Sequence, residues 1–205
     1  MGEICCHPPL VERGQSRAYR RVLWIALGVN LAMFIVEMIA GFSAGSVSLQ
    51  ANSLDFLGDT ANYGISLFVA GMALRSRAIA AFGKGVTMGL LGIWVLASSA
   101  WKGLAGTQPE AVTMGVVGFS ALAANAVCFA LLSTYRSSDS NMRSVWLCWR
   151  NDLIGNCAVL ASAIGVARTS AAWPDLLVAI MAGLALQGAA VVVKQARAEF
   201  AGAAK

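Results

Sequence analysis

The chain has 205 residues, of which 58% are hydrophobic and 12% are charged, and its formal net charge is +5. A soluble domain carries about 25% charged residues. Half that share, with a mean hydropathy of +0.69, excludes an ordinary soluble domain and indicates a polytopic membrane protein. The basic residues lie in short segments between apolar runs, where they orient membrane helices, so the positive charge does not predict nucleic-acid binding.

Membrane-spanning helices need about 20 mostly apolar residues. Six segments meet this requirement, at residues 22–42, 48–74, 86–105, 111–132, 145–167 and 176–193. The sequence therefore predicts an all-α membrane protein with a tail over residues 1–21, a six-helix transmembrane domain over residues 22–193 and a short tail over residues 194–205. The first run is interpreted as a retained helix, because it is longer than a signal-peptide core and lacks a small-residue cleavage site.

Basic residues are distributed unequally between the two sets of connecting segments. One set contains only Lys102 and Arg168, and the positive-inside rule places the richer set in the cytoplasm. Both termini are therefore predicted to be cytoplasmic, and Trp101 and Trp173 are expected at the outer interface. The basic residues of the cytoplasmic set are Arg13, Arg17, Arg20, Arg21, Arg75, Arg77, Lys84, Arg136, Arg143, Lys194, Arg197 and Lys205.

The second helix contains two aspartates, Asp55 and Asp59, in the stretch "SLDFLGDTANYG". An ionised carboxylate at the bilayer centre costs about 2.5–3.5 kcal/mol, so a pair of them needs compensation. Residues four apart share one helix face, and Asn52 and Asn62 lie near that face. Intramembrane acids are functional by default, which favours an ion site.

The fifth helix repeats this spacing with Cys148 and Asp152, and Asn156 follows one turn later. "LCWRNDLIGN" in this helix echoes "LDFLGDTAN" in the second, which indicates two inverted repeats of three helices with a site at their interface. Facing each other, the two helices would offer Asp55, Asp59, Cys148 and Asp152 as tetrahedral ligands, and Asn52 and Asn156 are weaker ligand candidates. Zinc favours that geometry and accepts thiolate and carboxylate.

Two alternatives stay open for these polar residues. Buried carboxylates also form proton relays without metal or pair with a basic side chain. Arg150, inside the predicted fifth helix, lies on the face opposite Cys148 and Asp152 and is not an obvious partner. A lone membrane cysteine is usually a packing residue, which is the interpretation for Cys128 and Cys157.

These motifs resemble those of the cation diffusion facilitators, a family of divalent-metal exporters with six transmembrane helices and cytoplasmic termini. "DFLGDTAN" matches the second-helix pattern at Asp55, Asp59 and Asn62, and "NMRSVWLCWRND" matches the fifth-helix pattern at Asn141, Arg143, Ser144 and Asp152. Further echoes are Asn30, Glu37 and Asn125. Cys148 stands where the family usually has histidine, which makes the site softer and favours zinc or cadmium over manganese or magnesium.

The resemblance implies efflux of a divalent metal, coupled to protons, by alternating access. It also implies a homodimer and no prosthetic group. The family usually has a cytoplasmic metal-binding domain after the sixth helix, and this sequence is expected to lack it. "CCH", at Cys5, Cys6 and His7, is a candidate auxiliary metal site, or a tail with two reduced thiols. The alternatives are a non-transporting metal sensor or partner subunit and a proton-relay transporter. An enzyme is not expected, because no nucleophile and base pair and no phosphate loop occur.

Overall fold

The computed structural model describes residues 17–69, 74–134, 139–178 and 194, without the side chains of residues 69, 74–75, 77–78 and 139–151. The described elements are helical, as predicted. They are α1 (Arg17–Ser43), α2 (Val47–Gly64), the π-helical segment η2 (Ile65–Val69), α3 (Leu74–Ala105), α4 (Ala111–Ser133), α5 (Asp139–Thr169) and α6 (Trp173–Val178).

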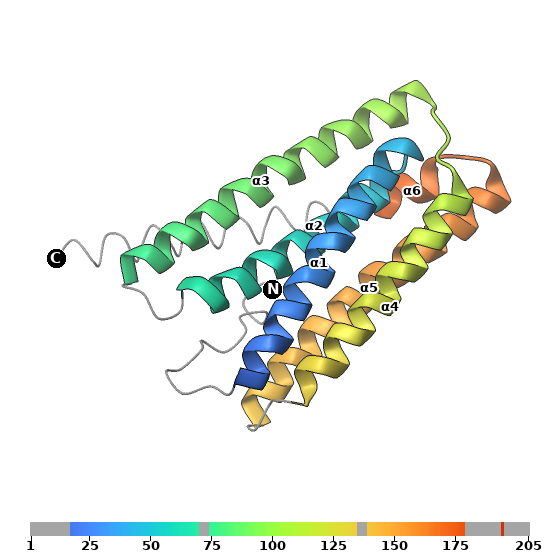
Figure 1. Ribbon diagram of the computed structural model, residues 1–205. Coiled ribbons are helices and arrows are strands. Elements are labelled where there is room, and N and C mark those ends of the chain that lie inside the picture. The colour runs from blue at the N-terminus through green and yellow to red at the C-terminus, as the bar shows by residue number, and fades with distance from the viewer. Residues whose placement is uncertain (1–16, 70–73, 135–138, 179–193, 195–205) are drawn as a thin grey trace.

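The long helices run back and forth between two ends of an elongated bundle (Figure 1). Helix α1 packs against α2 and α4, and α4 packs against α5. Helix α2 also contacts α3, α5 and α6, so it packs against most of the other described helices. The predicted aspartate pair therefore lies on the central helix of the described bundle.

Several helices begin earlier than predicted: α1 begins at Arg17 and α5 at Asp139, where the sequence placed residues 22 and 145. Helix α3 begins at Leu74, so the segment "RSRAIAAFGKG", predicted as a connection, forms its first turns. This segment has no proline and is rich in alanine and arginine, which are strong helix formers, so charge alone did not end the helix. The predicted second helix changes to π-helical geometry at Ile65–Val69. Residues 179–193 of the predicted sixth helix lie outside the described residues.

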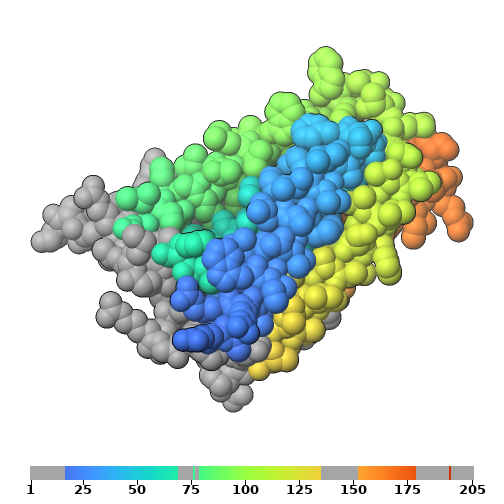
Figure 2. All heavy atoms as spheres, in the orientation of Figure 1, coloured from blue at the N-terminus to red at the C-terminus, as the bar shows by residue number. Residues whose placement is uncertain are grey.

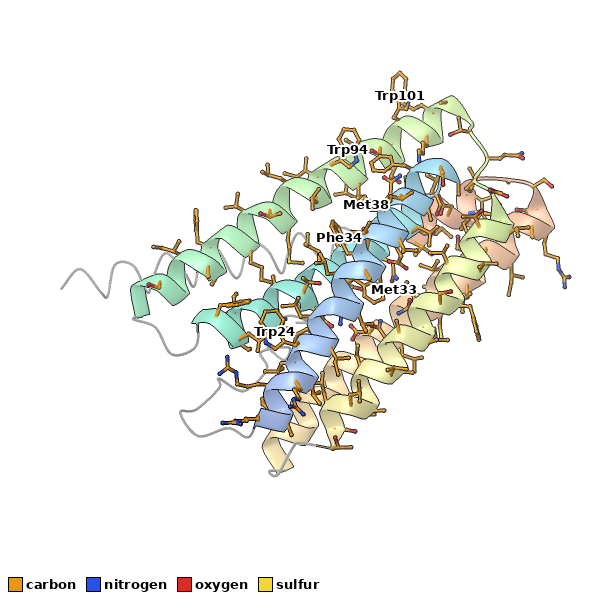
Figure 3. All side chains as sticks on the ribbon, in the orientation of Figure 1. Trp24, Met33, Phe34, Met38, Trp94 and Trp101 are labelled. Carbon is orange, nitrogen blue, oxygen red and sulfur yellow. The ribbon has the colours of Figure 1, made fainter. Side chains whose placement is uncertain are left out.

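The described surface is apolar and much of the described interior is polar. Exposed side chains include Ile39 and Phe42 on α1 and Leu90, Trp94 and Trp101 on α3. Trp94 and Trp101 project outward from α3 (Figure 3), and the space-filling view shows α1 flanked by α3 and α4 on this surface (Figure 2). The buried polar residues are Asn30, Glu37, Ser46, Ser48, Gln50, Asn52, Ser53, Asn62, Ser66, Asn125, Asn156, Ser162 and Asp175.

An apolar surface around a polar interior is the arrangement that a lipid environment favours. Lipid leaves no hydrophobic driving force between helices, so hydrogen bonds between polar side chains hold the helices together. Three described helical segments are long and apolar enough to cross a membrane, at Arg17–Ser43, Ile79–Ala105 and Ala111–Ser133. Trp101 is 73% exposed and Trp173 is 55% exposed, as expected for side chains at a membrane interface.

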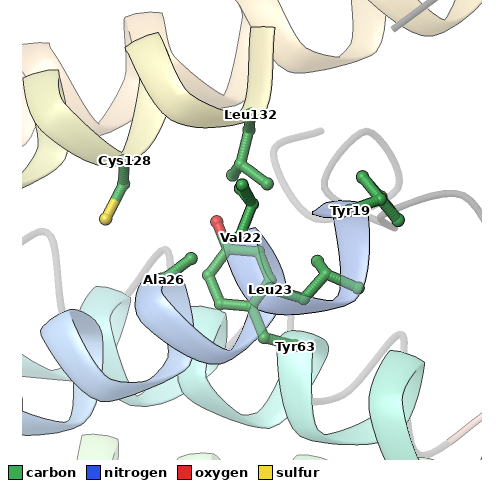
Figure 4. Packing of buried hydrophobic residues seen from close by; sticks show 7 residues of the cluster. All are labelled: Tyr19, Val22, Leu23, Ala26, Tyr63, Cys128 and Leu132. Carbon is green, nitrogen blue, oxygen red and sulfur yellow. The ribbon is translucent and has the colours of Figure 1, made fainter. Parts of the chain in front are cut away.

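An apolar cluster closes the end of the bundle where α1 begins (Figure 4). It joins α1, the end of α2 and the end of α4, and its buried members are Tyr19, Val22, Leu23, Ala26, Tyr63, Cys128 and Leu132. Cys128 is thus a packing residue, as predicted, and its Sγ accepts a hydrogen bond of 3.5 Å from Asn30 Nδ2. Cys157, which was also predicted to be a packing residue, is instead exposed on α5.

A buried carboxylate fixes the opposite end of α2. Asp175 of α6, 2% exposed, accepts hydrogen bonds from Ser46 Oγ at 2.7 Å, Val47 N at 2.8 Å and Ser48 N at 3.1 Å. Ser46 is the N-cap residue, and its Oγ accepts from Leu49 N at 3.2 Å. The first N–H groups of a helix have no partner within the helix, and a negative charge is favourable there. Asp175 therefore sets the position of α2 along the bundle.

Candidate metal centre

One face of α2 presents four polar side chains in a stripe. Asn52, Asp55, Asp59 and Asn62 follow one another at intervals of three or four residues, which places them on a common side of the helix. Asn52 is 1% exposed and Asn62 is 6% exposed, while both aspartates are partly buried. The stripe therefore faces the inside of the bundle, as the sequence predicted.

Asp152 of α5 lies near this stripe. Its carboxylate interacts electrostatically with those of Asp59 and Asp55, and α2 and α5 pack against each other. Asp152 is thus within electrostatic reach of Asp55 and Asp59, although among the described residues these three carboxylates do not have the spacing to hold one metal ion. Uncompensated, three such carboxylates inside a bundle repel one another, so this arrangement favours a cation between the two helices.

A buried hydrogen-bonded network adjoins the aspartates. Asn52 Nδ2 donates to Glu37 Oε1 at 2.8 Å and to Asn156 Oδ1 at 3.1 Å, and Asn156 Nδ2 donates to the backbone oxygen of Asp152 at 2.8 Å. Glu37, Asn52 and Asn156 come from three different helices and are at most 1% exposed. The network therefore fixes the relative positions of α1, α2 and α5 beside Asp55 and Asp152.

Glu37 is the member of this network to which the sequence had given no role. It interacts electrostatically with Asp55, and its Oε2, like Asn52 Oδ1, has no hydrogen-bond partner among the described residues. The available signal was an acid in the middle of an apolar run, together with its match to the family motif. Asn52 and Asn156, proposed as weaker ligand candidates, use their amide groups to hold the helices together.

A basic side chain from α3 reaches the other end of the stripe. Lys84 Nζ donates a hydrogen bond of 2.8 Å to Asn62 Oδ1, and the ammonium interacts electrostatically with Asp59. The sequence had assigned Lys84 to a cytoplasmic connection, where its charge would only orient the helices. Lys84 instead lies on α3, and its hydrogen-bond partner Asn62 is one turn from Asp59 on α2. The ammonium therefore contributes to the electrostatics of the site.

The described side chains form no closed coordination shell: among them, no three histidine, cysteine, aspartate or glutamate residues have the spacing to hold a metal ion. Cys148 lies on α5 one turn before Asp152, but its side chain is outside the described residues, as is that of Arg150. Cys5, Cys6 and His7 are also outside them.

These features define an integral membrane protein: its surface is apolar, and three described helical segments can span a membrane. The acidic residues inside the bundle are its candidate cation site. A comparison with protein families assigns the chain more narrowly: residues 23–201 match the family described as the cation efflux transmembrane domain. The chain belongs to this family, the cation diffusion facilitators that its helix motifs resemble.

Two curated relatives are similar to the chain over most of its length. They are the metal cation efflux system protein CzcD of Cupriavidus metallidurans and the cation efflux system protein CzcD of an Alcaligenes species, strain CT14. Each is 28% identical over 177 residues, which is 80% of this chain and 56% of the relative. The chain thus spans little more than half the length of these curated relatives.

Proposed function

We propose that the protein exports a divalent metal cation, with zinc or cadmium preferred, in exchange for protons. The membrane is proposed to be a bacterial inner membrane, since both curated relatives are bacterial. The chain would cross it six times, with both termini in the cytoplasm, and would act as a homodimer. It would be a secondary active transporter and not an enzyme, and its metal would be cargo.

The observation that best supports this function is the electrostatic interaction of Asp152 on α5 with Asp59 and Asp55 on α2, two helices that pack against each other. We propose these three carboxylates and Cys148 as the ligands of the transported ion. Rigid helices that contribute residues at four-residue spacing can present them to one ion. A thiolate beside carboxylates suits zinc and cadmium better than manganese or magnesium, which prefer oxygen ligands alone.

Proton exchange follows from the chemistry of the same ligands. Carboxylates and thiolates bind a divalent cation only when deprotonated, so metal binding releases protons and protonation releases metal. Protons that enter from outside would protonate the ligands and release the metal ion on that side. The deprotonated site would then bind another metal ion from the cytoplasm. The network of Glu37, Asn52 and Asn156 would hold α1, α2 and α5 in register while the helices alternate between the two states.

The proposed ligand set is tested by titrating the purified protein with Cd²⁺ while recording heat and ultraviolet absorption. The wild type is expected to bind one tight equivalent and to develop a cadmium–thiolate charge-transfer band. With Cys5 and Cys6 both replaced by serine to remove the other candidate thiolates, Cys148→Ser should remove the band. Asp59→Ala or Asp152→Ala should weaken binding by about a hundredfold or more. Cys157→Ser, which changes an exposed cysteine of the same helix, is the matched control. Tight binding that survives both aspartate substitutions would exclude this site.

A further inference from the structure

Lys84 occupies an unusual position for a residue of a cytoplasmic connection. It lies within the segment Ile79–Ala105, which is long and apolar enough to span a membrane, and it is partly buried. Its ammonium group donates to Asn62 Oδ1 at 2.8 Å and lies within electrostatic reach of Asp59. A lysine stem is flexible enough to reach the membrane interface instead, so the observed position needs an attraction that holds the ammonium inside.

The α2 stripe supplies that attraction. Asp59 is a carboxylate, and Asn62, 6% exposed, directs its amide oxygen to the Lys84 ammonium. Asn62 is one turn from Asp59, so the hydrogen bond holds the positive charge beside the proposed ligand. This places a cation of the protein itself at the edge of the site where a metal cation is expected.

We propose that Lys84 is an internal counter-ion of the α2 carboxylates, which competes with the metal ion and thereby sets the affinity and release rate of the site. This inference rests on the proposed function and adds a residue that neither the helix motifs nor the ligand set includes. In the metal-free protein the Lys84 ammonium lowers the repulsion among Asp55, Asp59 and Asp152. A bound divalent ion repels the ammonium, which leaves Asn62 and moves toward the interface.

The competition has a direct energetic consequence. Each metal ion that binds must give up the attraction between the ammonium and the carboxylates, so the lysine weakens binding. In exchange, the returning ammonium helps to displace the ion and prevents a trap in which metal binds too tightly to leave. A single charge near a partly desolvated site changes the binding of a divalent ion about tenfold.

The test compares Lys84→Gln and Lys84→Met with the wild type. Glutamine keeps a donor for Asn62 and removes the charge, and methionine removes both. Lys102→Met is the matched control: Lys102 is a basic residue at the other end of α3, and it interacts with Asp175 and not with Asp59. Lys84→Arg keeps the charge and should behave like the wild type. The readouts are the equilibrium Kd for Cd²⁺ in detergent and the KM and maximal rate of Cd²⁺ uptake into proteoliposomes.

Loss of the charge is expected to lower Kd and KM about tenfold and to lower the maximal rate, with Lys84→Gln and Lys84→Met alike. A purely structural contact between α2 and α3 would instead lower thermal stability in Lys84→Met and leave KM unchanged. Unchanged or weaker Cd²⁺ binding in both variants would overturn the inference, while the proposed function stands if the wild type binds. If neither the wild type nor any variant binds Cd²⁺, both the proposed function and this inference fail. Cd²⁺ binding that appears only in the Lys84 variants would support the inference.

Discussion

Asn52 on α2 donates a hydrogen bond of 3.1 Å to Asn156 on α5, and the two residues are 104 positions apart in the chain. Both side chains are 1% exposed. Because Asn156 also donates to the backbone of Asp152, this contact connects the helix of Asp55 and Asp59 directly to the turn that presents Asp152. The geometry of the proposed metal site therefore depends on an amide pair that itself need not touch the metal.

Asn156→Ala is expected to destabilise the protein and weaken the site together. The substitution leaves Asn52 with one acceptor fewer and frees the turn of Asp152, at a cost of about 1 kcal/mol in the membrane. Unfolding in detergent and a Cd²⁺ titration would measure both effects. Ser162→Ala on the same helix is the control, because Ser162 Oγ is buried without a partner in the described structure and its removal should be neutral. Equal effects of the two substitutions would contradict the connecting role of Asn156.

Asp175→Ala is expected to be the most destabilising single change outside the site. It removes the acceptor of Ser46 Oγ and of two backbone N–H groups that start α2, which should cost about 2–4 kcal/mol. Asp175→Asn retains one oxygen and should cost less. Thermal unfolding measures the order Ala, Asn, wild type. Glu110→Gln, at an exposed N-cap position without a side-chain cap, should leave the transition within error.

Two glycines of α1 should respond in opposite directions to alanine. A Cβ at Gly41 would lie 2.8 Å from Gln50 Cγ and 3.1 Å from Gln50 N, so Gly41→Ala should force the α1–α2 turn apart and cost about 1–3 kcal/mol. A Cβ at Gly28 would meet nothing within 4 Å, and Gly28→Ala should stabilise the helix by about 0.5–1 kcal/mol. Paired unfolding curves test this, and a stabilising Gly41→Ala would be inconsistent with the close approach.

Cys148→Ser is expected to change metal preference more than overall fold. Replacing a thiolate by a hydroxyl removes the softest proposed ligand, so cadmium should lose about tenfold more affinity than zinc. Competition titrations with the two ions would measure the ratio. Cys128→Ser serves as a structural comparison, since Cys128 packs in the apolar cluster and accepts from Asn30. A ratio that Cys148→Ser leaves unchanged would remove Cys148 from the ligand set.

The sequence was sufficient to predict the helical class, the family and the common face of Asp55 and Asp59, because composition and spacing are local signals. It placed the start of α3 at residue 86, whereas the helix begins at Leu74. Charge was interpreted there as the end of a helix, although arginine, lysine and alanine form helices readily. The contacts of Lys84 with Asn62 and of Asp175 with Val47 join residues far apart in sequence, so no local pattern could have predicted them.

Asp59 and its neighbours are proposed to bind an ion that protons displace. The most direct test is zinc uptake into proteoliposomes that contain the purified full chain, driven by an imposed proton gradient, with and without a protonophore. We expect the wild type to take up zinc only when the gradient is present, and Asp59→Ala to take up none. A wild type that binds zinc but moves none, or an Asp59→Ala variant that transports as fast as the wild type, would contradict it.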